Sequence, residues 1–117
     1  MGDLILANKQ GLIILTKIET LDKYTRVALR QFPKAEKFIL SGEIRSQVLS
    51  IKRNTIRAAK KYHKKTTLQD LDIDIEILRS YIRVAYRLHY IDEHKLGVWM
   101  DIVDEIGRMA GAWLMKQ

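Results

Sequence analysis

The chain has 117 residues and a formal net charge of +7, and 47% of its residues are apolar and 30% charged. This composition is typical of a globular protein and excludes a disordered chain, so we expect one domain over residues 1–117 with a single core. The absence of cysteine excludes disulfides and thiolate metal sites and fits a reducing cytoplasm, the expected location. Apolar runs such as residues 12–15 are too short to span a bilayer, so no membrane partner is expected.

The first predicted helix runs from about Leu12 to Arg30. Its apolar and small residues recur at the three- and four-residue spacing of one helix side, namely at Ile14, Ile18, Leu21, Thr25 and Ala28. Phe32 precedes a proline, which disfavours the α conformation and ends the helix. Pro33 is then expected to open the next helix, and residues 1–10 are expected to be loosely ordered.

The second predicted helix starts at Pro33 and reaches about His63, and it carries most of the positive charge. Its buried side is predicted to consist of Ile44, Val48, Ile51, Thr55, Ala58 and Tyr62. Residues 34–65 contain ten Lys or Arg against two acids, a local charge of +8. A rotation of about 100° per residue places most of these cations opposite the apolar side. The predicted basic face of this helix comprises Arg53, Arg57, Lys60 and Lys64, with Lys61 on its flank.

The third predicted helix spans about residues 69–89. Residues 71–75 alternate between apolar and acidic and could be a strand, but the pattern continues without a break into helical spacing. The early aspartates also suit the positive end of a helix. A second row of cations at four-residue spacing consists of Arg79, Arg83 and Arg87. Tyr86 and Tyr90 are expected near this row, where a ring could stack on an unpaired base.

The fourth predicted helix covers about residues 94–115, with Asp92 as its N-cap. The residues expected to face inward are Leu96, Trp99, Val103, Ile106 and Ala110. Gly107 and Gly111 lie four residues apart and are expected to permit close approach of another helix. Four helices with short joints predict an all-α fold, an antiparallel up-down-up-down four-helix bundle.

The two rows of cations indicate a phosphate-binding surface. Like charges at four-residue spacing disfavour a helix slightly, so a protein selected only for folding would alternate their signs. Contacts of this kind give affinity without sequence readout, and the affinity falls with salt. The alternative is an ordinary solvated face that keeps the protein soluble.

Four apolar residues lie off the predicted core sides: Ile39, Leu49, Ile56 and Ile73. Three of them are on one helix, which indicates a self-association interface. The alternative is that these side chains flank the core and are buried within one chain.

Residues for catalysis or metal binding are not recognisable in the sequence. His63, His89 and His94 lie near helix ends, and the sequence contains no H-E-x-x-H pattern. There is no cysteine, and the serines fall inside predicted helices, so no nucleophile with a base can be assigned. We therefore expect no catalytic activity, no metal and no cofactor.

Two blocks of sequence resemble known four-helix-bundle proteins. Residues 32–38 (FPKAEKF), 43–45 (EIR) and 50–54 (SIKRN) look like proteins encoded in intervening sequences of bacterial large-subunit rRNA genes. Residues 104–113 (DEIGRMAGAW), with Leu78-Arg79 and Ile82-Arg83, look even more like the related accessory variability determinant (Avd) of diversity-generating retroelements. The resemblance covers about residues 12–116. It implies a non-catalytic protein that forms a homopentameric barrel with a basic surface and binds a reverse transcriptase and its template RNA.

Two main hypotheses follow, of different kinds. The first is an Avd-like accessory factor whose two basic rows hold RNA phosphates, with the rRNA intervening-sequence protein as its near relative. The second is a self-assembling scaffold whose basic surface binds a protein partner and no RNA. An enzyme is a distant third, because the sequence contains no recognisable catalytic set.

Overall fold

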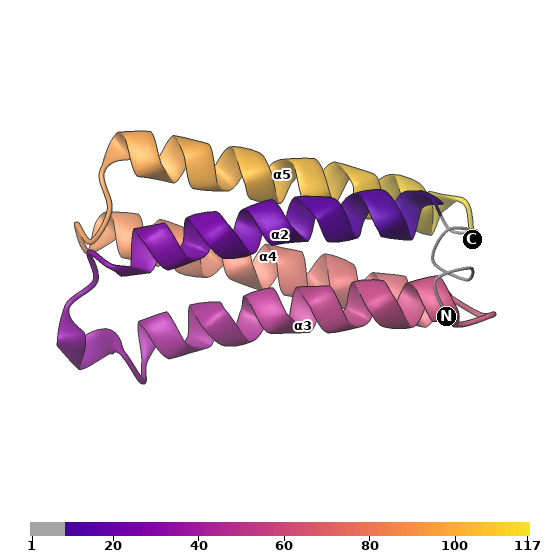
Figure 1. The fold of residues 1–117 in the computed structure, drawn as a ribbon, viewed down its shortest axis with the longest axis horizontal. Helices are drawn as coiled ribbons and strands as arrows, with labels where there is room; N and C mark the ends of the chain where they lie inside the picture. Colours follow the sequence, from indigo (N-terminus) through magenta and orange to yellow (C-terminus); the bar gives the residue numbers. More distant parts are fainter. Residues whose placement is uncertain (1–8) are drawn as a thin grey trace.

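The computed structural model describes residues 9–117, and over this range it consists of helices and no strand. The elements are α2 (Lys9–Leu29), the short 3-10 helix η1 (Lys34–Glu36), α3 (Leu40–Lys60), α4 (Lys65–Arg87) and α5 (Glu93–Met115) (Figure 1). The predicted all-α class with four long helices is confirmed. The expected loose order of residues 1–10 falls mostly outside the described residues, whereas Lys9 and Gln10 already belong to α2.

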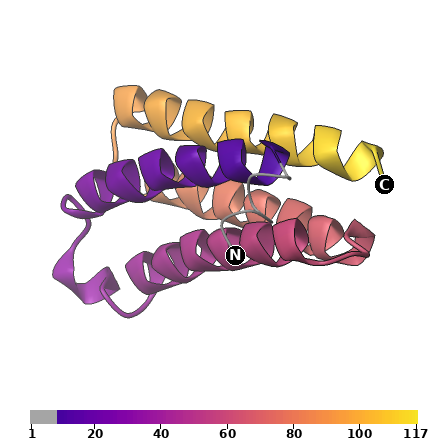
Figure 2. The same ribbon diagram turned by 45° about the vertical axis from the view of Figure 1, so that its right-hand side comes forward.

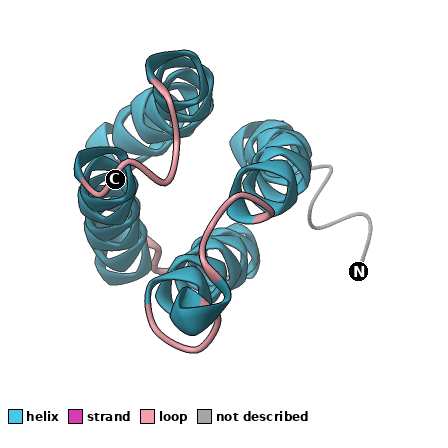
Figure 3. Ribbon diagram, turned by 90° about the vertical axis from the view of Figure 1, so that its left-hand side faces the viewer, coloured by secondary structure: helices cyan, strands magenta, loops and turns pink. Residues whose placement is uncertain are grey.

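The four long helices lie side by side around one core. α2 packs against α3 and α5, and α4 packs against the same two helices, so α2 and α4 occupy opposite corners (Figure 3). In Figure 1 the chain runs along α2 from right to left, back along α3, and again out along α4 and back along α5. The bundle is elongated, with extents of 42 × 22 × 21 Å, and the helices stay alongside one another in a view turned by 45° (Figure 2).

The core is formed by the apolar side of each helix, as periodicity predicted. All five residues predicted for the first helix are buried, and so are those of the fourth except Leu96, which is half-buried. Trp99 is the largest fully buried side chain. Its indole Nε1 donates a hydrogen bond of 3.1 Å to Oγ1 of Thr25, which satisfies a polar group that burial would otherwise penalise.

The second predicted helix is shorter than expected at both ends. Pro33 opens only η1, and the backbone of Ile39 (φ −113°, ψ −103°) leaves the helical region before α3 begins at Leu40. The break lets Phe32 stay buried against Tyr90, with ring centroids 5.2 Å apart, while Leu40 enters the core. A helix continuous from Pro33 would extend roughly 10 Å further. The other end stops at Lys60, so the predicted burial of Tyr62 is wrong: this side chain is 91% exposed.

The third and fourth helices follow their predictions closely. Residues 71–75 lie within α4, so rejection of the strand was right, although α4 starts at Lys65, four residues earlier than expected. His89 has a positive φ of 63° and ends the turn after α4. Asp92 caps α5 as predicted, because its Oδ1 accepts a hydrogen bond of 2.8 Å from the backbone N–H of Lys95. This hydrogen bond lowers the pKa of Asp92.

Candidate nucleic-acid interface

The exposed side of α3 carries three cations without an acidic partner. Arg53, Arg57 and Lys60 are exposed, and none forms an ion pair with any carboxylate of residues 9–117. The helix orients them outward because its opposite side, which includes Ile44 and Ile51, is buried in the core. No acidic residue occurs from position 44 to position 69. The charge of this face is therefore uncompensated locally.

Two further lysines that were predicted to contact phosphates, Lys61 and Lys64, lie in the connection between α3 and α4, and their ammonium groups have different partners. The Lys61 ammonium is exposed and donates to Oγ1 of Thr67 at 3.1 Å. The Lys64 ammonium turns back and donates to the carbonyl of Ala58 at 2.6 Å and also to that of Lys61. These are carbonyls that the end of a helix leaves without partners. Lys64 is thus committed to capping α3, and burial lowers its pKa.

The first cation of the α4 row, Arg79, is occupied by two carboxylates. Its Nε donates to Oδ1 of Asp104 on α5 at 2.8 Å, and its Nη1 donates to Oε2 of Glu76 at 2.9 Å. The side chain is only 21% exposed. Burial alone would lower the pKa of Arg79, but the hydrogen bonds and charges of Asp104 and Glu76 outweigh burial and raise it. We call Arg79, Glu76 and Asp104 the α4–α5 clamp.

Gly107 makes room for this clamp. A Cβ atom added at Gly107 would lie 2.5 Å from Nη2 of Arg79, whereas a Cβ at Gly111 would meet nothing within 4 Å. The prediction that the two glycines act as a pair for close helix approach is therefore wrong. One of them accommodates a guanidinium that crosses from α4, and the other borders open space.

The rest of the α4 row lies along α5. Arg83 is 3.8 Å from Oε1 of Glu76, and Arg83 and Arg87 border a shallow groove whose other wall includes Glu93 and Asp101. Carboxylates of α4 and α5 therefore lie along this row. Arg87 itself forms no ion pair with any residue of the described range 9–117.

The basic row of α4 does not lie on the side of α4 that packs against α3. Asp74 of α4 accepts hydrogen bonds from Ser50 (2.6 Å) and Asn54 (2.7 Å) of α3, which fixes the side of α4 that faces α3. Arg79 projects toward α5 instead. The α3 cations and the α4 row therefore do not merge into one continuous surface in the single chain.

The aromatic residues near the predicted rows also divide into two groups. Tyr86 is exposed beside Arg83 and Arg87. Tyr90 instead packs on Phe32, and a hydrogen bond to Glu36 raises its pKa, so it is not free to stack on a base.

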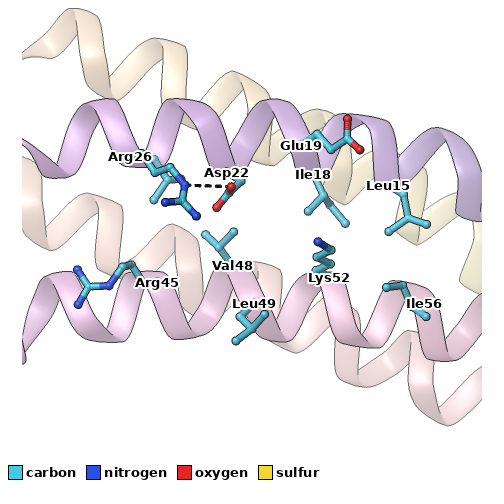
Figure 4. A pocket seen from close by; sticks show the side chains of 11 residues that line it. Leu15, Ile18, Glu19, Asp22, Arg26, Arg45, Val48, Leu49, Lys52 and Ile56 are labelled. Atoms are coloured by element: carbon cyan, nitrogen blue, oxygen red, sulfur yellow. Dashed lines mark hydrogen bonds and ion pairs between the residues drawn. The ribbon is translucent and has the colours of Figure 1, made fainter.

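A groove between α2 and α3 contains two of the four predicted interface residues (Figure 4). It has a volume of about 510 Å³, and its apolar lining includes Leu49 and Ile56. Charged side chains surround that lining: Glu19, Asp22, Arg26, Arg45 and Lys52. Ile39 lies in the turn before α3 and Ile73 on α4, and both are exposed outside the groove.

A family model described as bAvd-like matches residues 12–117. The chain belongs to the bAvd-like family. Comparison with curated proteins finds no match, and comparison with solved structures finds none either. The part of this bAvd-like chain that matches the family contains both basic rows, the α4–α5 clamp and the α2–α3 groove.

Within residues 9–117, no three His, Cys, Asp or Glu side chains gather as metal ligands would. No helix within the same range is long and apolar enough to cross a membrane.

Sequence reasoning missed two features of this surface. The pairing of Arg79 with Glu76 could have been found in the sequence, because Glu76 lies three residues before Arg79. The contact of Arg79 with Asp104 joins two helices and has no sequence signature. The exposure of Tyr62 depends on where α3 ends, and helix ends are the least reliable part of a sequence prediction.

Proposed function

We propose that this bAvd-like protein is a non-catalytic accessory factor that binds RNA through the exposed face of α3. The observation that supports the proposal is the set of unpaired cations Arg53, Arg57 and Lys60, in a stretch of 26 residues (44–69) without a carboxylate. Four cations elsewhere in the described part of the bundle, Lys17, Arg26, Arg79 and Arg83, do form ion pairs with acids. Unpaired, outward-facing cations on a rigid helix suit the phosphates of a nucleic acid.

The rest of the proposal follows from the family. Avd-like proteins are accessory and non-catalytic, and the resemblance extends to a reverse transcriptase of a diversity-generating retroelement as the protein partner. We therefore place this single-domain chain in the cytoplasm, as an antiparallel bundle that assembles into a homopentamer and supports that enzyme on its template RNA. A reverse-transcriptase gene and a variable repeat beside the gene for this chain would support this placement. Location inside an rRNA gene favours the intervening-sequence relative instead.

RNA binding is tested by titrating a fluorescently labelled RNA with the protein at 50 mM and 200 mM salt. If three cations contact the phosphates of a single strand, the affinity falls about 20-fold between these conditions. A protein that shows no binding at 50 mM salt contradicts the proposed RNA role.

A self-assembling scaffold without RNA binding is the second candidate, and the α2–α3 groove favours it. The groove contains the exposed Leu49 and the half-buried Ile56, which a second copy or a protein partner could cover. Sedimentation of the protein measures its assembly. Five copies of a 13.7 kDa chain give about 69 kDa. Assembly without RNA binding supports the scaffold, whereas RNA binding supports the accessory factor.

A further inference from the structure

The connection between α3 and α4 presents two aromatic rings to solvent. The Tyr62 side chain is 91% exposed, and the imidazole ring of His63 meets it edge to face, with ring centroids 4.8 Å apart and an interplanar angle of 89°. Neither ring belongs to the core. Tyrosine is enriched at binding interfaces, because its ring is apolar and its hydroxyl group is polar.

The backbone below these rings is held from both sides. The N–H of Lys61 donates to the carbonyl of Arg57 at 2.9 Å, and the Lys61 ammonium reaches Thr67 at the start of α4. The Lys64 ammonium closes the connection by donating to carbonyls at the end of α3. The backbone that carries both rings is therefore held in place, so a ligand that stacks on them pays little entropy for ordering the chain.

The charged residues on both sides of the rings in the chain are all basic. Lys60, Lys61 and Lys65 are exposed on either side of Tyr62, and the nearest acids in sequence are Glu43 and Asp70. An aromatic face among cations matches single-stranded nucleic acid, in which an unpaired base stacks while the adjacent phosphates meet the cations. In a duplex the faces of the bases are already stacked on one another, so an aromatic side chain has no free base face to stack on.

A second exposed aromatic residue lacks this combination of a free ring face and basic neighbours. Phe38 is 85% exposed in the turn before α3, but Lys37 places its Nζ over the ring, 5.4 Å from the centroid. Glu36 and Glu43 lie close to it in the chain. Phe38 thus has an occupied ring face and nearby negative charge, and it serves as a matched control for loss of an exposed aromatic side chain.

We infer that Tyr62, with His63 beside it, stacks on an unpaired base of single-stranded nucleic acid whose phosphates lie on Lys60, Lys61 and Lys65. The inference rests on the proposed function, because it presupposes nucleic-acid binding by the basic face. It adds that the protein distinguishes single strands from duplexes and that the α3–α4 connection makes this distinction.

The test compares the wild type with Tyr62→Leu and Phe38→Leu. Each protein is titrated at 50 mM salt with an unstructured 12-nucleotide RNA, with DNA of the same sequence, and with the corresponding RNA duplex. Tyr62→Leu is expected to lose about 5- to 100-fold in affinity for the single strand and less than about twofold for the duplex. Phe38→Leu is expected to change neither affinity more than about twofold. The DNA arm shows whether the site requires RNA or accepts any single strand.

Two further variants test whether an aromatic ring at position 62 is sufficient for the single-strand affinity. Tyr62→Phe keeps an aromatic face and should keep the single-strand affinity. Tyr62→Trp should also keep it, and its new exposed indole should be quenched when the RNA binds.

Equal losses of single-strand and duplex affinity in Tyr62→Leu, or no loss in either, overturn the stacking site while leaving RNA binding intact. A wild type that binds none of the three probes overturns the proposed function as well. Because Tyr62 is outside the core, an unchanged urea midpoint for Tyr62→Leu verifies that the variant is folded.

Discussion

The α4–α5 clamp predicts that Arg79 stabilises the bundle and contributes little to RNA binding. Replacement by methionine keeps an apolar stem but removes the hydrogen bonds to Asp104 and Glu76. Charge-assisted hydrogen bonds contribute about 1.5–3 kcal/mol when shielded, and exposed ion pairs about 0.2–1 kcal/mol. Arg79 is 21% exposed, but Asp104 is 44% and Glu76 64% exposed. We therefore expect Arg79→Met to cost about 1–2 kcal/mol, roughly 4 °C in Tm for each kcal/mol.

A double-mutant cycle isolates the contact between the two helices. The cycle combines Arg79→Met with Asp104→Asn, and the unfolding free energies are measured in urea, which unlike guanidinium does not screen charges. We expect a coupling energy of about 1 kcal/mol at low salt. The matched control is Arg83→Met, because its guanidinium lies 3.8 Å from Glu76 and is about half exposed, so its effect should stay within about 0.5 kcal/mol.

RNA binding by the same variants separates the two possible roles of Arg79. Arg79→Met should leave the salt dependence of RNA binding unchanged, whereas Arg53→Met should lower its slope by about 0.7, as expected for one lost phosphate contact on a single strand. A coupling energy near zero, or equal losses of RNA affinity in the two variants, would refute the assignment of Arg79 to the clamp.

Three further predictions concern packing and caps. Gly111→Ala should stabilise the protein by up to about 1 kcal/mol, because alanine favours a helix. Gly107→Ala should gain less or lose stability, because its Cβ would displace the clamp guanidinium. Urea midpoints measure both effects, and equal gains in stability would contradict the clamp geometry. Thr25→Val should cost about 1–3 kcal/mol, because the buried indole N–H of Trp99 then lacks an acceptor; an unchanged free energy of unfolding would contradict this role of the hydrogen bond. The lowered pKa of Asp92 means that its contribution is present above its ordinary value of 3.8 and is lost as the pH falls through the lower folded value. Thermal melts between pH 2 and pH 6 should therefore show a smaller acid loss for Asp92→Asn, and identical pH profiles would count against the cap.

Much of the fold was predictable because the core sides follow the helical period. Ile14, Leu21 and Ile44 are buried where the spacing placed them. The errors concentrate at helix ends. Periodicity carries no information on where a helix stops. Near the two ends of α3 lie the packing of Phe32 on Tyr90 and the hydrogen bond from Lys64 to the carbonyl of Ala58, and neither contact follows from the spacing of apolar residues.

The candidate site was predictable only in part, for a related reason. A helical projection identifies which cations point away from the core, and it placed Arg53 and Arg57 correctly on an exposed face. It does not show which carboxylates of a neighbouring helix reach them. Arg79 lies on the flank that meets α5, so Asp104 occupies its guanidinium, and this contact is visible only once the helices are packed.

The central claim is that the uncompensated cations of α3 make the phosphate contacts. The most direct measurement is the salt slope of RNA binding for the triple variant Arg53→Gln, Arg57→Gln, Lys60→Gln, compared with a control triple that removes the same charge from other exposed positions, Lys23→Gln, Arg30→Gln, Lys34→Gln. Both triples lower the net charge from +7 to +4. The α3 triple should lose about 2 units of slope, from three contacts at about 0.7 each, and the control triple should lose almost none. Equal slopes in the two triples would show that net charge alone, and no particular face, determines the binding.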